Sequence, residues 1–156
     1  MAQQLWLLRH GEAEPHEARD DADRRLTPRG ERQSRAAGAA LAALNVEFDS
    51  VYSSPRVRAL DTARLACESL GVDEPAVEDS LSGGFDVADA RALLTAHDAD
   101  ARILVVGHEP DFSQVVLDLT GGRVDFKKGG VAAVRLGTSP ELMVLLRPRE
   151  LESIAG

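Results

Sequence analysis

The chain has 156 residues, 44% of them hydrophobic, and a formal charge of −8. This length and composition fit a single globular domain over residues 1–156 with a substantial core. The acidic balance argues against nucleic acid as a partner, because nucleic-acid-binding proteins normally carry a basic face. No apolar run approaches the ~18–20 residues of a membrane span and no secretory leader is visible, so we expect a cytoplasmic protein without membrane attachment.

The N-terminal run Leu5-Trp6-Leu7-Leu8 is followed directly by Arg9-His10-Gly11. An apolar run of this length predicts a buried strand of an α/β sheet. Such sheets bind their ligands just beyond the carboxyl ends of their strands. Gly11 lets the backbone turn sharply and leaves His10 uncrowded. The alternative is an Arg-His pair that ends a strand in solvent.

Helix and strand signals alternate after this strand. A polar loop, residues 12–25, leads to Thr27-Pro28, where an N-cap and a first-turn proline begin an alanine-rich helix that runs to Leu44. Phe48–Ser53 is predicted to be the second strand. Ser54-Pro55 repeats the N-cap and proline signal and predicts a helix that reaches about Leu70.

Two arginines, Arg56 and Arg58, fall in the predicted first turn of that second helix. Cations are disfavoured there, because the helix dipole already supplies positive potential and the free backbone N–H groups favour an anion. A bound phosphate or carboxylate would explain both arginines. The alternative is a solvated pair neutralised by Asp61, at a cost of a few tenths of a kcal/mol.

The second half of the chain completes the predicted fold. The strand that ends in Gly107-His108 is the most apolar and therefore the best candidate for the centre of the sheet. The whole pattern predicts an α/β fold, a single three-layer domain with a mostly parallel central sheet flanked by helices and an antiparallel part near the end. The segments are a loop over residues 74–84 with a short extended piece, a helix over 86–97, a strand over 102–108, a helix over 110–120 and two edge-like strands over 131–136 and 142–146.

Two predicted strands end in a histidine, which would bring His10 and His108 together at one edge of the sheet, beside Arg9 and Arg56. Two imidazoles and two guanidiniums suit a dianionic phosphoryl group, since guanidinium forks match phosphate oxygens. A metal held by these histidines with Glu12 and Glu109 is the competing interpretation. We expect no metal, because the arginines would repel a divalent cation and no His-Glu-x-x-His spacing is present.

Three other residues of chemically active types are expected to have no catalytic role. Cys67, the single cysteine, lies among apolar residues at helical spacing and is interpreted as a small core residue. Having one cysteine excludes an internal disulfide and fits a reducing compartment. His16 lies in the polar loop and His97 at the end of a predicted helix, so both are expected to be solvated.

The motifs resemble those of the histidine phosphatase superfamily, which has the phosphoglycerate mutase-like fold. Four blocks in the family's order carry the resemblance, and they cover most of the chain. The short chain, with no large insertion between its second and third strands, is most similar to the SixA branch, the phosphohistidine phosphatases. The blocks are Leu8–Glu12, Leu26–Gly30, Ser53–Ala63 and Val106–Pro110.

The resemblance implies roles for these residues. His10 would attack phosphorus and carry a covalent phosphohistidine, a two-step route typical of covalent catalysis. Arg9, Arg56 and His108 would hold the non-bridging oxygens. Arg24, or Arg25 if the loop shifts by one residue, would reach the phosphate, with Gly11 beside the substrate. No cofactor is implied, and Lys127 and Lys128 are expected on a solvated rim.

The sequence departs from the broader family at the general acid, for which only Glu78 and Asp79 are candidates by position. An ester leaves as an alkoxide and gains roughly 10²–10⁴ in rate from a proton donor, whereas a phosphoramidate leaves as a much less basic imidazole. We therefore expect a phosphorylated protein carrying phosphohistidine as the partner. The alternatives are a phosphatase of small phosphorylated metabolites with Glu78 or Asp79 as acid, and a non-catalytic phosphate-binding module. A monomer is compatible with the sequence, which leaves the oligomeric state open.

Overall fold

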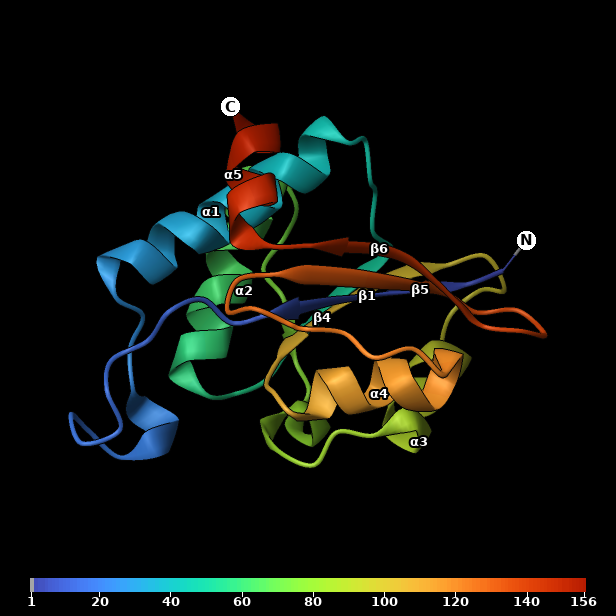
Figure 1. The fold of residues 1–156 in the computed structure, drawn as a ribbon, viewed down its shortest axis with the longest axis horizontal. Helices are drawn as coiled ribbons and strands as arrows, with labels where there is room; N and C mark the ends of the chain where they lie inside the picture. The colour runs from blue at the N-terminus through green and yellow to red at the C-terminus, as the bar shows by residue number, and fades with distance from the viewer. Residues whose placement is uncertain (1) are drawn as a thin grey trace.

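The computed structural model describes residues 2–156 and has a six-stranded central sheet (Figure 1). The strand order is β3-β2-β4-β1-β5-β6, so β4 is central, as the sequence predicts, with β1 beside it. Three of the five neighbouring pairings are parallel, and the two that involve β5 are antiparallel. The strands are β1 (Gln4–Arg9), β2 (Ser50–Ser53), β3 (Ala76–Val77), β4 (Arg102–Gly107), β5 (Val131–Arg135) and β6 (Glu141–Leu146).

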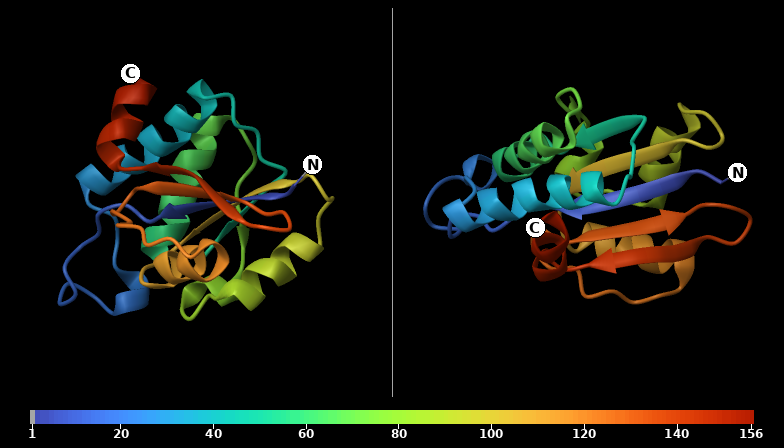
Figure 2. Two further views of the ribbon diagram at one scale, coloured as in Figure 1. Left: turned by 45° about the vertical axis from the view of Figure 1, so that its right-hand side comes forward. Right: turned by 90° about the horizontal axis from the view of Figure 1, so that it is seen from above.

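Helices cover both faces of the sheet, which gives the three layers (Figures 1 and 2). One face is covered by α1 (Pro28–Ala43), α2 (Val57–Leu70) and α5 (Pro148–Ala155), and α1 packs against both of the others. The opposite face is covered by α3 (Val87–Thr95) and α4 (Asp111–Thr120). Two short 3₁₀ turns, η1 (Asp21–Asp23) and η2 (Asp79–Ser82), lie in the connecting loops.

Alternation along the central strands builds two separate cores. Leu5 and Leu7 of β1 belong to the cluster under α3 and α4, whereas Trp6 and Leu8 belong to the cluster under α1, α2 and α5. All four side chains are buried, because successive residues of a strand point to opposite faces and both faces are covered. The continuous apolar run that signalled this strand is therefore a consequence of helices on both sides.

Small residues allow α1 and α2 to lie close together. A Cβ on Gly38 of α1 would come within 2.3 Å of the carbonyl oxygen of Ala66 in α2. Thr27 is the N-cap of α1 as predicted, since its side chain accepts a hydrogen bond from the N–H of Gly30 at 3.1 Å. The close helix pair fixes α2, and with it the arginines at its start, against the end of β1.

The structure corrects three predictions about the elements. Helix α2 begins at Val57, so Arg56 is its N-cap and only Arg58 lies in its first turn. Strand β5 is interior, between β1 and β6, because the hairpin places only β6 at the edge. Helix α5 was missed altogether, although Pro148 stands at its first position. Among residues 2–156, no helix is long and apolar enough to cross a membrane.

Candidate active site

The carboxyl ends of β1, β4 and β2 meet at one edge of the sheet and bring the two predicted histidines together. Parallel pairing puts Arg9 opposite Gly107, and the N–H of His10 donates to the carbonyl of Gly107 at 3.1 Å. The ring centroids of His10 and His108 are 5.3 Å apart. Both side chains are 7% exposed. The prediction that His10 and His108 lie together at one edge of the sheet is therefore confirmed.

His10 is held in one orientation by its own neighbour. Its Nδ1 lies 2.7 Å from the carbonyl oxygen of Gly11, so Nδ1 carries the proton and donates. Burial, joined by the charges of Arg58, Arg9 and Lys128, lowers the pKa of His10 to about 3 against the raising effect of the Gly11 hydrogen bond. At neutral pH the ring is therefore uncharged and its Nε2 presents a lone pair.

His108 is tied to the end of β2. Its Nε2 lies 2.8 Å from Oγ of Ser54, and Ser54 Oγ also accepts a hydrogen bond from the N–H of Arg56 at 3.2 Å. The buried Nδ1 of His108 has no hydrogen-bond partner within residues 2–156. Burial, followed by the neighbouring His10 and arginines, lowers the pKa of His108 to about 3. The contact with Ser54 therefore holds a neutral His108 ring in place beside His10.

Arg9 is anchored by a loop that is distant in the sequence. Its Nη1 donates to the carbonyl of Phe126 at 2.7 Å. The N–H of Gly129 donates to the carbonyls of both Arg9 and His10, at 3.0 and 2.9 Å, and the N–H of Arg9 donates to the carbonyl of Gly130. The loop over residues 126–130 is therefore fixed against the backbone of the two predicted site residues.

Arg58 is the residue that the sequence analysis placed beside the site but did not assign. It is 5% exposed, and its charge is the first among those that lower the pKa of His10. The side chain of Arg56 is 31% exposed, and its charge acts on His108 rather than on His10. Because α2 begins at Val57, the buried arginine near the histidines is Arg58. The motif alone did not indicate at which residue the helix begins.

Asp21, in η1, gathers three arginines beside the histidine pair. Its Oδ1 accepts from Arg24 at 2.9 and 3.1 Å, and its Oδ2 accepts from Arg58 at 3.2 Å and from Arg56. Its carbonyl accepts from Nη1 of Arg58 at 2.6 Å. Arg24 is 8% exposed and also donates to the carbonyl of Glu14. The predicted Arg24 therefore joins the cluster, whereas the carboxylate that binds it was not anticipated.

The reason for glycine at position 11 differs from the prediction. A Cβ on Gly11 would come within 2.6 Å of the carbonyl oxygen of Gly30 in α1. The N–H of Gly11 donates to Oγ1 of Thr62, which in turn donates to the carbonyl of Arg58. Gly11 is thus required for a close approach between the loop and α1, and Thr62 ties that loop to the start of α2.

The two candidate acids come directly after β3, Glu78 before η2 and Asp79 at its start. The N–H of Glu78 donates to the carbonyl of Ser53 at 2.8 Å, and the carboxylate of Glu78 caps η2 by accepting from N–H and Oγ of Ser80. Asp79 is exposed to solvent. The charges that shift the pKa values of His10 and His108 include Asp21, and neither Glu78 nor Asp79 is among the main contributors.

The remaining active residue types lie away from this edge. Cys67 is buried in the core with a pKa raised to about 11 by burial, as expected for a packing residue. His16 is 85% exposed, whereas His97 departs from its prediction by lying 2.8 Å from the hydroxyl of Tyr52. Among residues 2–156, no three His, Cys, Asp or Glu side chains are grouped as metal ligands would be.

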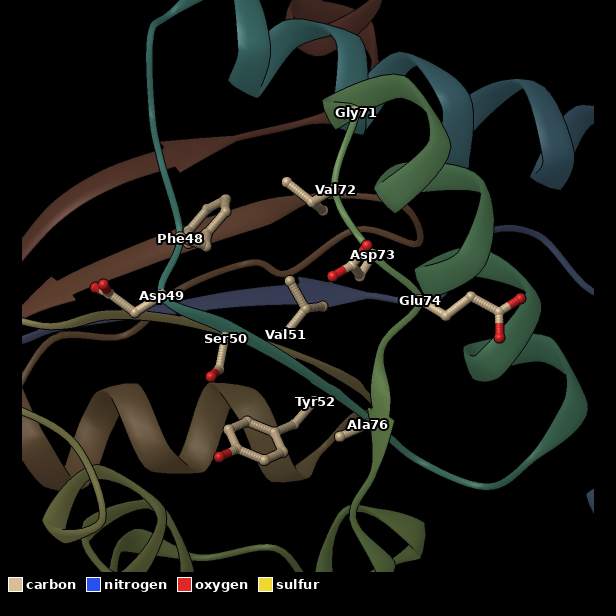
Figure 3. Close-up of a pocket in the computed structure, with 10 residues that line it drawn as sticks. All are labelled: Phe48, Asp49, Ser50, Val51, Tyr52, Gly71, Val72, Asp73, Glu74 and Ala76. Atoms are coloured by element: carbon tan, nitrogen blue, oxygen red, sulfur yellow. The ribbon is translucent and has the colours of Figure 1, made fainter.

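A hollow at the opposite end of β2 has a different character (Figure 3). It has a volume of about 520 Å³ and lies between the start of β2 and the segment after α2. Its charged lining residues are Asp49, Asp73 and Glu74, and it contains none of the predicted site residues. An anionic ligand therefore has its complement at the histidine edge and not in this hollow.

A paired-histidine edge with buried arginines defines a class of phosphoryl-transfer proteins. The model of the histidine phosphatase superfamily (branch 1) matches residues 5–82. The chain is 31% identical to an uncharacterized protein of Picosynechococcus sp. (strain PCC 7002) over 163 residues, which cover 95% of this chain and 98% of that protein. The chain belongs to the histidine phosphatase superfamily.

Within the superfamily the chain is of the SixA type. The protein histidine phosphatase SixA, solved in complex with tungstate, matches it with a TM-score of 0.83 and 29% identity, over 95% of this chain and 99% of that one. A protein of Escherichia coli K-12 described as an alpha-ribazole-5'-P phosphatase has the same fold, with a TM-score of 0.76 and 23% identity over 95% of this chain and 98% of that one. The activity that follows is that of a phosphatase that works through a histidine.

Proposed function

We propose that this protein removes the phosphoryl group from phosphohistidine in a protein, with His10 as the nucleophile. The observation that carries the proposal is the state of His10, a buried and uncharged imidazole whose Nδ1 is held by Gly11 and whose Nε2 is left with a lone pair. A neutral nucleophile fixed among cationic groups is suited to attack at an anionic phosphorus centre.

In the first step, Nε2 of His10 forms a bond to phosphorus while the bond from phosphorus to the substrate's imidazole nitrogen breaks. The electron pair of that bond leaves with the imidazole, which departs neutral when its other nitrogen carries a proton. Arg9 and Arg58 balance the charge on the non-bridging oxygens, and His108, whose ring lies beside that of His10, contacts one of them. The product of this step is a phosphohistidine at His10.

In the second step, water attacks phosphorus and the bond to Nε2 of His10 breaks. Inorganic phosphate is released, one proton of the water passes to solvent, and Nε2 regains its lone pair. No metal or cofactor is needed in either step, since the positive charge that stabilises the transferring group comes from the arginines, with the neutral His108 beside them.

A phosphoramidate substrate is favoured by the state of Asp21, the carboxylate whose charge acts on His108. Burial opposes it, but the hydrogen bonds and charges of Arg24 and Arg58 lower the pKa of Asp21, so its carboxylate stays ionised. An ionised carboxylate cannot donate a proton to an alkoxide leaving group. An imidazole leaving group has much less need of such a donor, whereas an ester would lose roughly 10²–10⁴ in rate.

Phosphate release from a phosphohistidine protein and from an unactivated alkyl phosphate, with His10→Ala alongside, tests the proposal. We expect fast release from the first, slow release from the second, and loss of both in the variant. Rapid cleavage of an unactivated alkyl phosphate that falls on Glu78→Gln or Asp79→Asn would replace the proposal with a small-molecule phosphoesterase. Tungstate binding without any turnover would replace it with a phosphate-binding module.

A further inference from the structure

A basic groove, defined here by Arg9, Glu12, Arg29, Gln33, Lys127, Lys128, Arg147, Pro148 and Arg149, adjoins the candidate active site. It has a volume of about 480 Å³. Six of the 18 Lys and Arg residues of the chain line it, but only one of the 26 Asp and Glu residues does. In a protein whose net charge is −8, this is a strong local reversal of sign.

Four separate segments build the basic groove, the first of them the end of β1 with Arg9. Arg29 stands at the start of α1, Arg149 near the start of α5, and Lys127 and Lys128 in the loop that is hydrogen-bonded to Arg9 and His10. Both helices present their N-terminal ends, where the helix dipole adds positive potential to that of the side chains. The groove therefore carries more positive potential than its side-chain charges alone would give.

The cations of the groove are only partly neutralised within the protein. Arg29 lies 3.9 Å from Glu12, Arg149 lies 3.8 Å from Glu150, and their side chains are 66% and 77% exposed. Lys127 pairs with Asp125 at 3.0 Å, while Lys128 has no ion pair within residues 2–156. Arg147 is held by Glu150 at 2.7 Å, but exposed pairs contribute little to folding, so Arg29, Lys127, Lys128 and Arg149 are available to an external anion.

Two residues of the groove connect it to the candidate active site. Arg9 directly precedes His10, and Lys128 is close enough for its charge to lower the pKa of His10. A substrate whose phosphoryl group reaches His10 would therefore place its flanking residues against the groove. Arg9, Arg58 and His108 are the groups proposed to contact the phosphoryl group. The exposed cations of the groove are therefore left for other negative charges of the substrate.

We propose that the basic groove docks an acidic segment, rich in Asp and Glu, that flanks the phosphohistidine of the protein substrate. This inference rests on the proposed function and adds the kind of sequence that the enzyme selects. Complementary charge across a wet interface raises the association rate and selects the partner, and both effects weaken with salt.

Two synthetic phosphohistidine peptides of equal length test this docking, one with Asp and Glu around the phosphohistidine and one with Asn and Gln in their place. For the wild-type protein we expect kcat/KM to be about tenfold higher for the acidic peptide at low ionic strength, mainly through KM, since a few exposed charge pairs contribute this much. We expect 0.5 M salt to abolish most of the preference.

Variants separate the groove from the general charge of the protein. Lys127→Gln with Arg149→Gln should lose most of the preference and keep its rate on the neutral peptide. Arg64→Gln with Arg91→Gln changes the net charge equally at exposed positions outside the groove and should behave as wild type. All four side chains are exposed, so neither variant should affect folding.

Each other result would overturn the docking inference in a distinguishable way. Equal wild-type rates on the two peptides would reject the acidic partner but retain the phosphatase. An equal loss by the groove variant on phosphoramidate itself, a donor without flanking residues, would assign the cations to the phosphoryl group. No phosphate release from either peptide, with esters cleaved instead, would reject the proposed function and the docking together.

Discussion

His10 and His108 are buried at the ends of neighbouring strands, each with a pKa of about 3, whereas a histidine of the unfolded chain has a pKa near 6.5. Below pH 6.5 the unfolded state therefore binds protons that the folded state does not. Because protons bound to the unfolded state favour unfolding, stability is complete above pH 6.5 and is lost as the pH falls toward 3. The slope is about 1.4 kcal/mol per pH unit for each histidine.

This linkage predicts the behaviour of His10→Asn. Between pH 7 and pH 5, we expect wild type to lose about 2 kcal/mol more of its free energy of unfolding than the variant, because the variant has one fewer depressed histidine. Urea unfolding of both proteins at the two pH values measures the difference. His16→Asn is the matched control, since the exposed His16 should leave the wild-type pH dependence intact. Identical losses in wild type and His10→Asn would contradict the depressed pKa.

The two arginines at the start of α2 should differ in their importance. Arg58 is buried beside His10, so we expect Arg58→Gln to lower kcat/KM by about 10²–10³, the usual cost of removing one preorganised donor. Arg56 is more exposed and its charge acts on His108, so Arg56→Gln should cost less, about tenfold. Steady-state kinetics on a phosphohistidine substrate compares them. A larger loss in Arg56→Gln would restore the original assignment from the sequence.

Asp21 competes with phosphate for the same guanidinium groups. Asp21→Asn removes the negative charge while keeping the shape, so we expect inorganic phosphate to inhibit the variant at roughly three- to tenfold lower concentration. The inhibition constants of the two proteins give the comparison, with Asp23→Asn as a control in the same turn. Weaker inhibition of Asp21→Asn would mean that Asp21 mainly holds the arginines in place.

At the scale of the elements, close helix contact depends on single glycines. A Cβ at Gly38 would lie 2.3 Å from the backbone of α2, so we expect Gly38→Ala to lower the free energy of unfolding by about 1–3 kcal/mol. Gly137→Ala is the control, because its Cβ would have no neighbour closer than 3.9 Å and its backbone is not left-handed. Denaturant unfolding of the three proteins tests the contact, and an unchanged midpoint for Gly38→Ala would refute it.

The sequence predicted those elements whose signals are local. The strands β1 and β4 are continuous apolar runs, and α1 begins with Thr27-Pro28, so each was found close to its observed bounds. Helix α5 was missed because it has only eight residues, although Pro148 at its first position and Glu150, whose carboxylate accepts from the N–H of Arg147, could have signalled it. Strand β5 was misplaced at an edge, since pairing with β1 depends on the tertiary fold.

The parts of the site that were predicted also depend on local signals in the sequence. The strand ends fixed His10 and His108, because parallel strands bring their carboxyl ends together. The choice between Arg56 and Arg58 depended on the residue at which α2 begins, and a shift of two residues changes the side chain that faces the histidines. The contact of Asp21 with Arg58 spans 37 residues of chain, and no local pattern indicates it.

At the scale of the whole molecule, ligand binding and folding are linked. The groups that face the histidine edge come from β1, β4, α2 and the loop before α1, which are brought together only in the folded state. Inorganic phosphate should therefore stabilise the protein by about 2 kcal/mol at roughly 30 times its Kd, which raises Tm by about 4–8 °C. A thermal melt in phosphate and in chloride of equal ionic strength measures this, and Arg58→Gln should show a smaller rise.

The carboxylate of Asp21 has a consequence for an enzyme that works in a background of its own product. Because the loop carries it, the carboxylate is present at a fixed effective concentration whatever the solution contains. Free phosphate must exceed that concentration before it occupies the arginines, whereas a substrate docked elsewhere on the protein delivers its phosphoryl group at an effective concentration of its own. In the absence of substrate, Asp21 and not ambient phosphate would then occupy the arginines. Ambient phosphate would therefore not inhibit the enzyme.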